Sequence, residues 1–203
     1  SRLAVATDNS VYQSLPQAVV LPKNQADLVV LTTLASQPEH QQVRFSPRGG
    51  GTGTNGQSLT QDIVVDLSRY MNQVLEVNAA EGWVRVQAGV IKDQLNDALR
   101  PHGYFFSPDL STSNRATVGG MINTDASGQG SLKYGKTSDH VLALQSVLMS
   151  GDTLHTQAMP IAAQVGADHG MVLGRVSLKT RNPENTPNTW QTSVLEHFEE
   201  QKL

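Results

Sequence analysis

The residue types best suited to chemistry in this 203-residue chain gather at 48–56. The run reads Arg-Gly-Gly-Gly-Thr-Gly-Thr-Asn-Gly, so five of its nine residues are glycines. Successive glycines let main-chain N–H groups converge on one point, and such a cluster of donors suits phosphate oxygens. Arg48, Thr52, Thr54 and Asn55 add side-chain donors. The run therefore predicts a phosphate-binding loop, with a flexible turn between two strands as the alternative.

The residues that follow decide which kind of phosphate loop this is. A P-loop needs G-x-x-x-x-G-K-[ST], but Gln57 and Ser58 follow Gly56. The stretch 51–56 satisfies G-x-G-x-x-G, yet the dinucleotide fingerprint must run from a strand into a helix. Only six residues separate Gly56 from the apolar run that starts at Ile63, which leaves no room for that helix. We therefore expect a loop between two strands that holds a pyrophosphate with its main chain.

A second region rich in small and polar residues spans 107–135. Small residues let main chain lie flat against a planar ligand, and hydroxyl and amide side chains can meet the polar edge of that ligand. The small residues are Ala116, Gly119, Gly120, Ala126, Ser127 and Gly128, and the polar ones are Ser113, Asn114, Thr117 and Asn123. Such a wall suits the isoalloxazine ring of a flavin, which has an apolar end and a hydrogen-bonding end. An irregular structural loop is the alternative.

Together the two regions resemble the FAD-linked oxidase superfamily, the family of vanillyl-alcohol oxidase and p-cresol methylhydroxylase. The first run is similar to the pyrophosphate loop of that family. From 107 onward the chain carries, in the family's order, a proline loop, T-[IV]-G-G, a segment of the N-x-[AS]-G type, Y-G and a strand with V-L. The resemblance covers about residues 16–156. It is greatest to bacterial dehydrogenases of D-2-hydroxy acids (D-lactate, glycolate and D-2-hydroxyglutarate) that carry an added iron–sulfur domain.

The resemblance implies that FAD lies non-covalently between two lobes of the domain. Some relatives tether FAD through a His in the first loop, and Thr52 stands at the matching position here. The residues implied to hold the pyrophosphate are Arg48, Gly49, Gly50, Gly51, Thr52, Gly53, Thr54, Asn55 and Gly56. Those implied to lie along the ribityl chain and the ring are Pro108, Asp109, Ser113, Asn114, Thr117, Gly119, Gly120, Asn123, Asp125, Ala126 and Ser127, with Tyr134 and Val141 packed close by. The motif with which the family closes this domain, G-S-E-G-T-L-G-I, has only a poor match at 166–174.

The activity implied by the resemblance is oxidation of a D-2-hydroxy acid to the 2-oxo acid, by hydride transfer to flavin N5. We expect the chain to be one domain of a longer enzyme and inactive alone, because the family's acid–base groups lie largely on a C-terminal substrate domain. No catalytic base and no electron acceptor are assigned. Arg115 is a candidate cation for a substrate or a flavin carbonyl, whereas Lys133 and Lys136 are more simply solvated surface. Two alternatives stay open: a module that keeps the fold without FAD, and a flavoenzyme of the UDP-sugar reductase type.

These sites need a scaffold of short strands and few helices, whose hydrophobic periodicity is visible in the sequence. Helices are expected at 24–36 and 91–99, and strands at 18–21, 43–46, 63–67, 73–77, 83–87, 141–149, 153–155 and 172–179. The expected fold class is α+β: a two-lobed FAD-binding domain with a small strand–helix–strand lobe and a larger lobe built on a mixed or antiparallel sheet. The expected boundaries are 1–70 for the first lobe, 71–180 for the second, and 181–203 for a linker and tail.

Composition excludes several other classes of protein. A net charge of −3 and a pI near 6.0 offer no basic surface for nucleic acid. The absence of cysteine rules out disulfides and thiolate metal sites, so an iron–sulfur cluster is expected only outside these residues. The six histidines are not clustered, and no metal site is expected. No run approaches the roughly 20 apolar residues of a membrane helix, and we expect a cytoplasmic protein.

Overall fold

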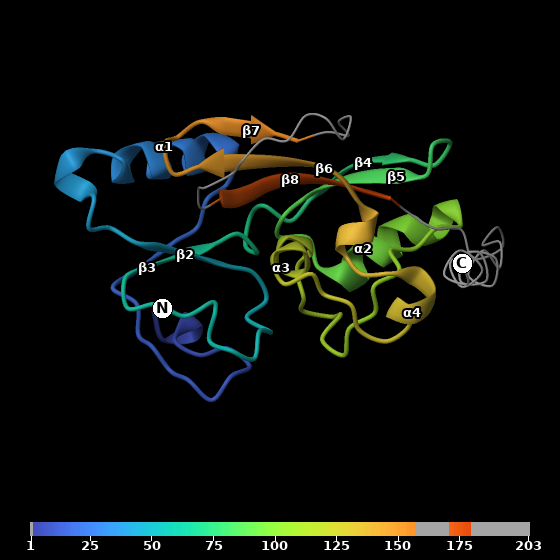
Figure 1. The fold of residues 1–203 in the computed structure, drawn as a ribbon, viewed down its shortest axis with the longest axis horizontal. Coiled ribbons are helices and arrows are strands. Elements are labelled where there is room, and N and C mark those ends of the chain that lie inside the picture. Colours follow the sequence, from blue (N-terminus) through green and yellow to red (C-terminus); the bar gives the residue numbers. More distant parts are fainter. Residues whose placement is uncertain (1, 157–170, 180–203) are drawn as a thin grey trace, which may run out of the picture.

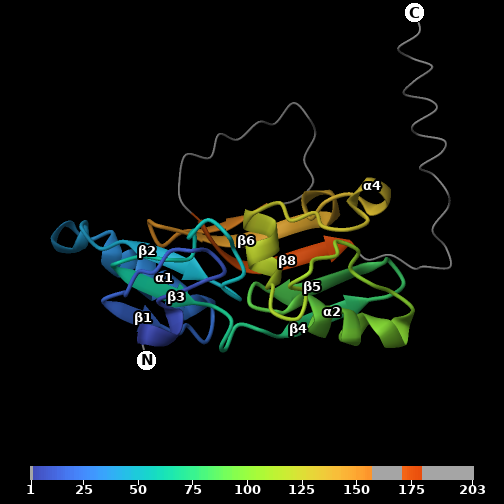
Figure 2. The ribbon, with the colours of Figure 1, turned by 90° about the horizontal axis from the view of Figure 1, so that it is seen from below.

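The computed structural model describes residues 2–156 and 171–179, which form two β-sheets with helices packed against them. Figure 2 shows the first sheet and α1 at one end of the molecule and β4, β5 and α2 at the other. Four short 3-10 helices complete the described elements: η1 (Arg2–Val5), η2 (Pro38–His40), η3 (Arg100–His102) and η4 (Ser138–His140). Within this part of the chain no helix is both long and apolar enough to cross a membrane.

The first sheet has three parallel strands in the order β1-β3-β2. The strands are β1 (Ala18–Val20), β2 (Phe45–Arg48) and β3 (Ile63–Asp66). The central strand β3 begins with three β-branched residues, of which Val64 and Val65 are buried, as expected for a strand with neighbours on both sides. β2 begins two residues later than the sequence predicted, because its pairing with β3 starts at Phe45 opposite Ile63.

The helix α1 (Gln25–Ala35) connects β1 to β2 and confirms the predicted helix. Asn24 caps it by accepting a hydrogen bond of 3.1 Å from the N–H of Asp27. Its buried residue Leu28 belongs to a cluster with Val65 of the first sheet and Val147 of the second. Figure 1 shows α1 beside β6 and β7, so this helix joins the two sheets.

The second sheet has five strands in the order β4-β5-β8-β6-β7, and all neighbours are antiparallel. They are β4 (Val74–Asn78), β5 (Trp83–Gln87), β6 (Val141–Leu148), β7 (Thr153–His155) and β8 (Met171–Lys179). The antiparallel form of the predicted sheet is therefore confirmed. The two sheets lie on either side of residue 70, where the lobe boundary was predicted; the predicted tail 181–203 lies outside the described residues, as do 166–170 of the poorly matching closing motif.

The helices α2 (Lys92–Leu99) and α3 (Val118–Asn123) lie beneath the second sheet in Figure 1. They share the larger core with that sheet. Its fully buried members include Val84, Val86, Leu95, Leu99, Phe106, Val118 and Leu178. The sequence predicted α2 but neither α3 nor α4 (Ser131–Tyr134). Both lie in the glycine- and serine-rich region. They are too short to show a helical periodicity in the sequence, and glycine lowers helix propensity.

Candidate cofactor-binding site

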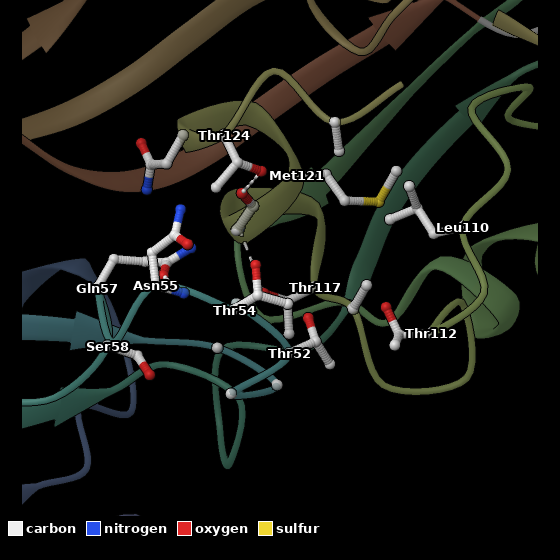
Figure 3. A pocket seen from close by; sticks show the side chains of 18 of the residues that line it. Thr52, Thr54, Asn55, Gln57, Ser58, Leu110, Thr112, Thr117, Met121 and Thr124 are labelled. Atoms are coloured by element: carbon white, nitrogen blue, oxygen red, sulfur yellow. Dashed lines mark hydrogen bonds between the residues drawn. The ribbon is translucent and has the colours of Figure 1, made fainter. Parts of the chain in front are cut away.

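A cleft of about 750 Å³ lies between the β2–β3 loop and the segment that contains α3. This volume falls in the range of small-molecule and cofactor sites. Figure 3 shows Asn55, Gln57 and Ser58 on one side of the space and Leu110 and Thr112 on the other. The lining residues are Pro47, Gly49, Gly50, Gly51, Thr52, Gly53, Thr54, Asn55, Gln57, Ser58, Leu110, Thr112, Ala116, Thr117, Gly120, Met121, Asn123, Thr124 and Ala126.

No charged side chain is among these lining residues. The polar groups that face the cleft are hydroxyls, amides and main chain, and the apolar ones include Leu110 and Met121. Any charge on a ligand must therefore be met by neutral dipoles in the cleft and by cations placed behind its walls.

Main-chain donors without partners are concentrated in the loop. Within residues 2–156 and 171–179, the N–H groups of 50–54 donate no hydrogen bond to another protein group. Main-chain N–H groups are normally paired or satisfied by a ligand or water. Gly51 has a φ of 63°, a left-handed conformation that glycine adopts without strain. The loop thus presents the free donors that bind an anion.

The loop is held in place by close contact with the opposite wall. A Cβ on Gly49 would run into the hydroxyl of Thr117, and one on Gly50 would run into the carbonyl oxygen of Arg115. The guanidinium of Arg115 also donates a hydrogen bond of 3.1 Å to the Gly50 carbonyl. The two glycine-rich regions therefore interlock, and each fixes the position of the other.

Arg48, predicted to hold the pyrophosphate, is buried, and its guanidinium binds the N-terminal segment. Its guanidinium donates to the carbonyl of Thr7 at 2.8 Å, to that of Val5 at 3.4 Å and to the hydroxyl of Ser58 at 3.2 Å. The Ser58 hydroxyl in turn donates to the Asp8 carboxylate at 3.1 Å. Burial lowers the pKa of Arg48, which the charges of Asp66 and Asp8 partly offset. Arg48 does not line the cleft; it anchors the N-terminal segment 2–14 to the loop.

The wall opposite the loop is built on the short helix α3. Thr117 caps α3 by accepting a hydrogen bond of 3.3 Å from the N–H of Gly120. Val118 and Gly119 face the core, and a Cβ added to Gly119 would lie only 2.9 Å from the Cβ of Ala88. This orientation leaves Gly120, Asn123 and Thr124 to line the cleft, at the spacing of one helical face.

A turn after α3 completes this wall. Asp125 is the only described non-glycine residue with a positive φ, 44°. Its carboxylate accepts hydrogen bonds from the N–H of Ser138 at 3.0 Å and from the ammonium of Lys136 at 3.1 Å. The hydrogen bonds from Ser138, with a smaller effect of Lys136, lower the pKa of Asp125. The turn places Ala126 against the cleft while Asp125 itself points to Ser138 and Lys136.

The structure brings about half of the predicted binding residues together in the cleft. The predicted residues that line it are Gly49, Gly50, Gly51, Thr52, Gly53, Thr54, Asn55, Thr117, Gly120, Asn123 and Ala126. Those outside its lining are Arg48, Gly56, Pro108, Asp109, Ser113, Asn114, Gly119, Asp125, Ser127, Tyr134 and Val141.

Three of the predicted residues outside the lining make contacts elsewhere. Asp109 pairs with the buried ammonium of Lys92 at 3.1 Å. Gly56 packs under the ring of Tyr12. The Tyr134 ring stands edge-on to Phe105, with centroids 5.7 Å apart.

Ala116, one of the small residues expected to lie against the flavin ring, also lines the cleft. Seven lining residues were not predicted from the sequence: Pro47, Gln57, Ser58, Leu110, Thr112, Met121 and Thr124. Gln57 and Ser58 directly follow the glycine loop, so a longer window would have included them. Once α3 is known, Thr124 can be predicted to line the cleft, because it lies on the same helical face as Gly120. Leu110 and Met121 have no local signal, because the tertiary packing of their segments brings them to the cleft. Among the described residues, no group of three or more His, Asp or Glu side chains is placed to hold a metal ion.

Comparison with protein families gives a match over residues 16–157 to the family described as "FAD binding domain". The chain is 68% identical over 158 residues to a D-2-hydroxyglutarate dehydrogenase of Haemophilus influenzae, an alignment that covers 78% of this chain and 15% of that protein. It is 60% identical over 176 residues to a D-2-hydroxyglutarate dehydrogenase of Escherichia coli, covering 86% of this chain and 17% of the relative. The chain thus spans about a sixth of the length of these relatives.

A more distant relative and a solved structure extend the comparison. The chain is 39% identical to the glycolate oxidase subunit GlcD of Bacillus subtilis over 71% of this chain and 30% of that subunit. Among solved structures, an alkyldihydroxyacetonephosphate synthase superposes with a TM-score of 0.68 at 24% identity, over 81% of this chain and 31% of the other. That superposition shows a shared fold.

Proposed function

The chain belongs to the family of FAD-binding domains of the vanillyl-alcohol oxidase type, and on this premise we propose that its cleft holds FAD non-covalently for the oxidation of a D-2-hydroxy acid. The resemblance noted in the sequence and the two-lobed α+β fold class are both confirmed. The observation that carries the proposal is the set of unpaired main-chain donors at 50–54 in a cleft without charged side chains.

In this proposal the loop 49–54 binds the pyrophosphate. Its free N–H groups supply donors to the phosphate oxygens, and the hydroxyls of Thr52 and Thr54 add to them. Thr52 offers no ring nitrogen to bond to a flavin, which supports non-covalent binding.

The wall formed by 110–126 is the proposed surface for the ribityl chain and the ring. Leu110 and Met121 supply apolar contact, while Thr117, Asn123 and Thr124 supply hydrogen-bonding groups. Flavin sites need this mixture, because a mostly apolar pocket with a few placed polar groups fixes the orientation of a ligand.

When bound, FAD supplies the hydride acceptor, and the protein supplies position and electrostatics. No titratable side chain lines the described cleft. We therefore assign the base that takes the hydroxyl proton, and the cations that hold the substrate carboxylate, to groups outside this lining. The chain contains no cysteine, so an iron–sulfur cluster would have to be held elsewhere in a longer protein. We expect the chain alone to bind FAD without turning over a hydroxy acid.

The substrate proposed for the whole protein is D-2-hydroxyglutarate, supported by the names of relatives at 68% and 60% identity. D-Lactate and glycolate are the next candidates, since more distant relatives are a D-lactate dehydrogenase and a glycolate oxidase subunit. A reductase of UDP-sugars is the less favoured flavoenzyme, and turnover of a UDP-enolpyruvyl sugar would establish it instead.

The test is a titration of the purified chain with FAD, followed by fluorescence and by the visible spectrum after desalting. Saturable binding with one FAD per chain is the expected result. A chain that is folded by circular dichroism but shows no saturable binding would favour a module that keeps the fold without the cofactor. The full-length protein, assayed with D-2-hydroxyglutarate, D-lactate and glycolate, then ranks the substrates.

A further inference from the structure

We infer that Arg115 strengthens pyrophosphate binding through the peptide group that joins Gly50 to Gly51, an inference that rests on the function proposed above. The guanidinium of Arg115 donates a hydrogen bond of 3.1 Å to the carbonyl oxygen of Gly50. That carbonyl and the N–H of Gly51 belong to one peptide group. Arg115 is therefore a positioning residue, because it acts on the ligand through the main chain of the loop and does not line the cleft.

A cation on the carbonyl side of a peptide group makes the N–H on its other side a stronger donor. Charge-assisted hydrogen bonds are stronger than neutral ones, and hydrogen bonds in series polarise one another. Gly51 lines the cleft, and its N–H has no protein acceptor within 2–156 and 171–179. The donor that gains strength is thus one that is free to meet a phosphate oxygen.

The hydrogen bond from Arg115 to Gly50 matters because the cleft has no charged side chain of its own. A pyrophosphate is negatively charged, yet no charged side chain lines the cleft. The guanidinium of Arg48 is occupied by the carbonyls of Val5 and Thr7 and by the hydroxyl of Ser58. Burial has the largest effect on the pKa of Arg48 and lowers it, and the charges of Asp66 and Asp8 raise it. The charge of Arg115 has a smaller effect and lowers it, so a weak repulsion acts between the two cations. An anion bound at the loop relieves that repulsion.

The main chain around Arg115 holds it in the required place. The N–H of Arg115 donates to the carbonyl of Thr112 at 2.9 Å, which fixes the residue in a turn. The carbonyl of Arg115 lies where a side chain on Gly50 would be. Both the carbonyl and the guanidinium of Arg115 therefore face Gly50. The same contacts would also hold the two walls of the cleft together if Arg115 were uncharged. The test must therefore distinguish an effect of the charge of Arg115 from a purely structural contact, called here a mechanical clasp.

The experiment compares Arg115→Met and Arg115→Lys with the wild-type chain. Arg100→Met is the matched control, because Arg100 is also an exposed arginine but pairs with Asp97 on α2 at 2.8 Å. The dissociation constants of FAD and of riboflavin, which has no phosphate, are measured by flavin fluorescence at about 0.05 M and about 0.5 M salt. These concentrations bracket a Debye length of about 10 Å, so they change the screening of an exposed charge.

If Arg115 acts by charge, Arg115→Met raises the dissociation constant of FAD about five- to tenfold at low salt, the size of a charge-assisted hydrogen bond reduced by exposure to solvent. The effect shrinks at high salt, Arg115→Lys restores much of the affinity, and riboflavin binding and the Arg100→Met control change less than about twofold.

A loss of FAD affinity that is the same at both salt concentrations, or that is equal for FAD and riboflavin, would show a mechanical clasp and overturn the inference. An unchanged FAD affinity in Arg115→Met would overturn it as well. A wild-type chain that binds no FAD would be a different result, since it refutes the proposed function itself.

Discussion

At Gly50 the two walls of the cleft come into direct contact, so this position tests how the site is assembled. An added Cβ would run into the carbonyl oxygen of Arg115, a main-chain atom that cannot rotate away. Gly50→Ala should therefore push the walls apart. We expect a stability loss of about 1–3 kcal/mol, typical of overpacking, and an FAD dissociation constant raised more than tenfold, measured by thermal unfolding and by titration.

Gly103→Ala is the control variant, because it strains the backbone without pushing the walls of the cleft apart. Gly103 has a φ of 72° but no atom within 4 Å of an added Cβ, and it does not line the cleft. The alanine costs about 1–2 kcal/mol of backbone strain and should leave FAD affinity unchanged. If Gly50→Ala bound FAD as tightly as Gly103→Ala does, contact between the walls would not be needed for the site.

Among the elements, α3 shows why part of the site could not be predicted from the sequence. The loop 49–56 is a local pattern, and its glycines indicate free N–H groups wherever the loop lies. The helix α3 has only six residues and begins with Val118-Gly119-Gly120, so it has no periodicity to detect. The contacts of Arg48 could not be predicted for a related reason: its type indicates a phosphate ligand, but the segment 2–14 that accepts its hydrogen bonds is brought to it only by tertiary folding.

The cap of α3 can be tested directly. Thr117 is buried, and its hydroxyl accepts from the N–H of Gly120. Thr117→Val keeps the shape but removes the acceptor, so we expect a stability loss of about 1 kcal/mol and FAD affinity weakened several-fold, because the fraying helix carries Asn123 and Thr124 at the cleft. Thr117→Ser keeps the hydroxyl and should bind FAD within twofold of wild type. Equal FAD affinities for the two variants would show that the cap of α3 does not affect FAD binding.

The N-terminal segment adds a dependence on pH. Asp8 accepts hydrogen bonds from the N–H of Ser10 at 2.9 Å and from Ser58 at 3.1 Å. Burial raises the pKa of Asp8, but the hydrogen bonds from Ser10 and Ser58 and the charge of Arg48 outweigh it, so the pKa lies below its ordinary value. A lowered folded-state pKa favours the native state above the unfolded value of about 3.9, and this stabilisation is lost as pH falls through the folded value.

Asp8→Asn should therefore destabilise the chain at neutral pH and not in acid. The expected decrease in Tm at pH 7 is about 1–3 °C, because the group is partly exposed, and it should shrink as the pH falls through the lowered folded-state pKa of Asp8. Asp97→Asn, which breaks an exposed pair on α2, is the control and should change Tm little at either pH. A decrease that persisted unchanged in acid would show that the carboxylate charge of Asp8 does not stabilise the fold.

For the whole molecule, the two-lobed plan could be predicted because each sheet has its own run of apolar strands on one side of residue 70. The connection between the lobes could not, since it depends on which face of α1 is buried. That helix is apolar nearly all round, with Val30 and Leu34 exposed and Leu28 buried. The structure shows that its buried face packs on residues from both sheets, so the lobes share one core cluster although their sheets are separate.

The shared cluster predicts that the two lobes unfold together. Leu28 of the first lobe is 1% exposed and lies in the cluster that contains Val65 and Val147, one from each sheet. Leu28→Ala removes packing from both lobes and should cost about 2–5 kcal/mol, whereas Val30→Ala, at a side chain 67% exposed, should cost little. Far-ultraviolet circular dichroism and release of bound FAD are followed through the same thermal transition. If the lobes form a single cooperative unit, the two midpoints coincide and shift together in Leu28→Ala. If FAD is released well before secondary structure is lost, and Leu28→Ala shifts only one of the two midpoints, α1 does not couple the lobes.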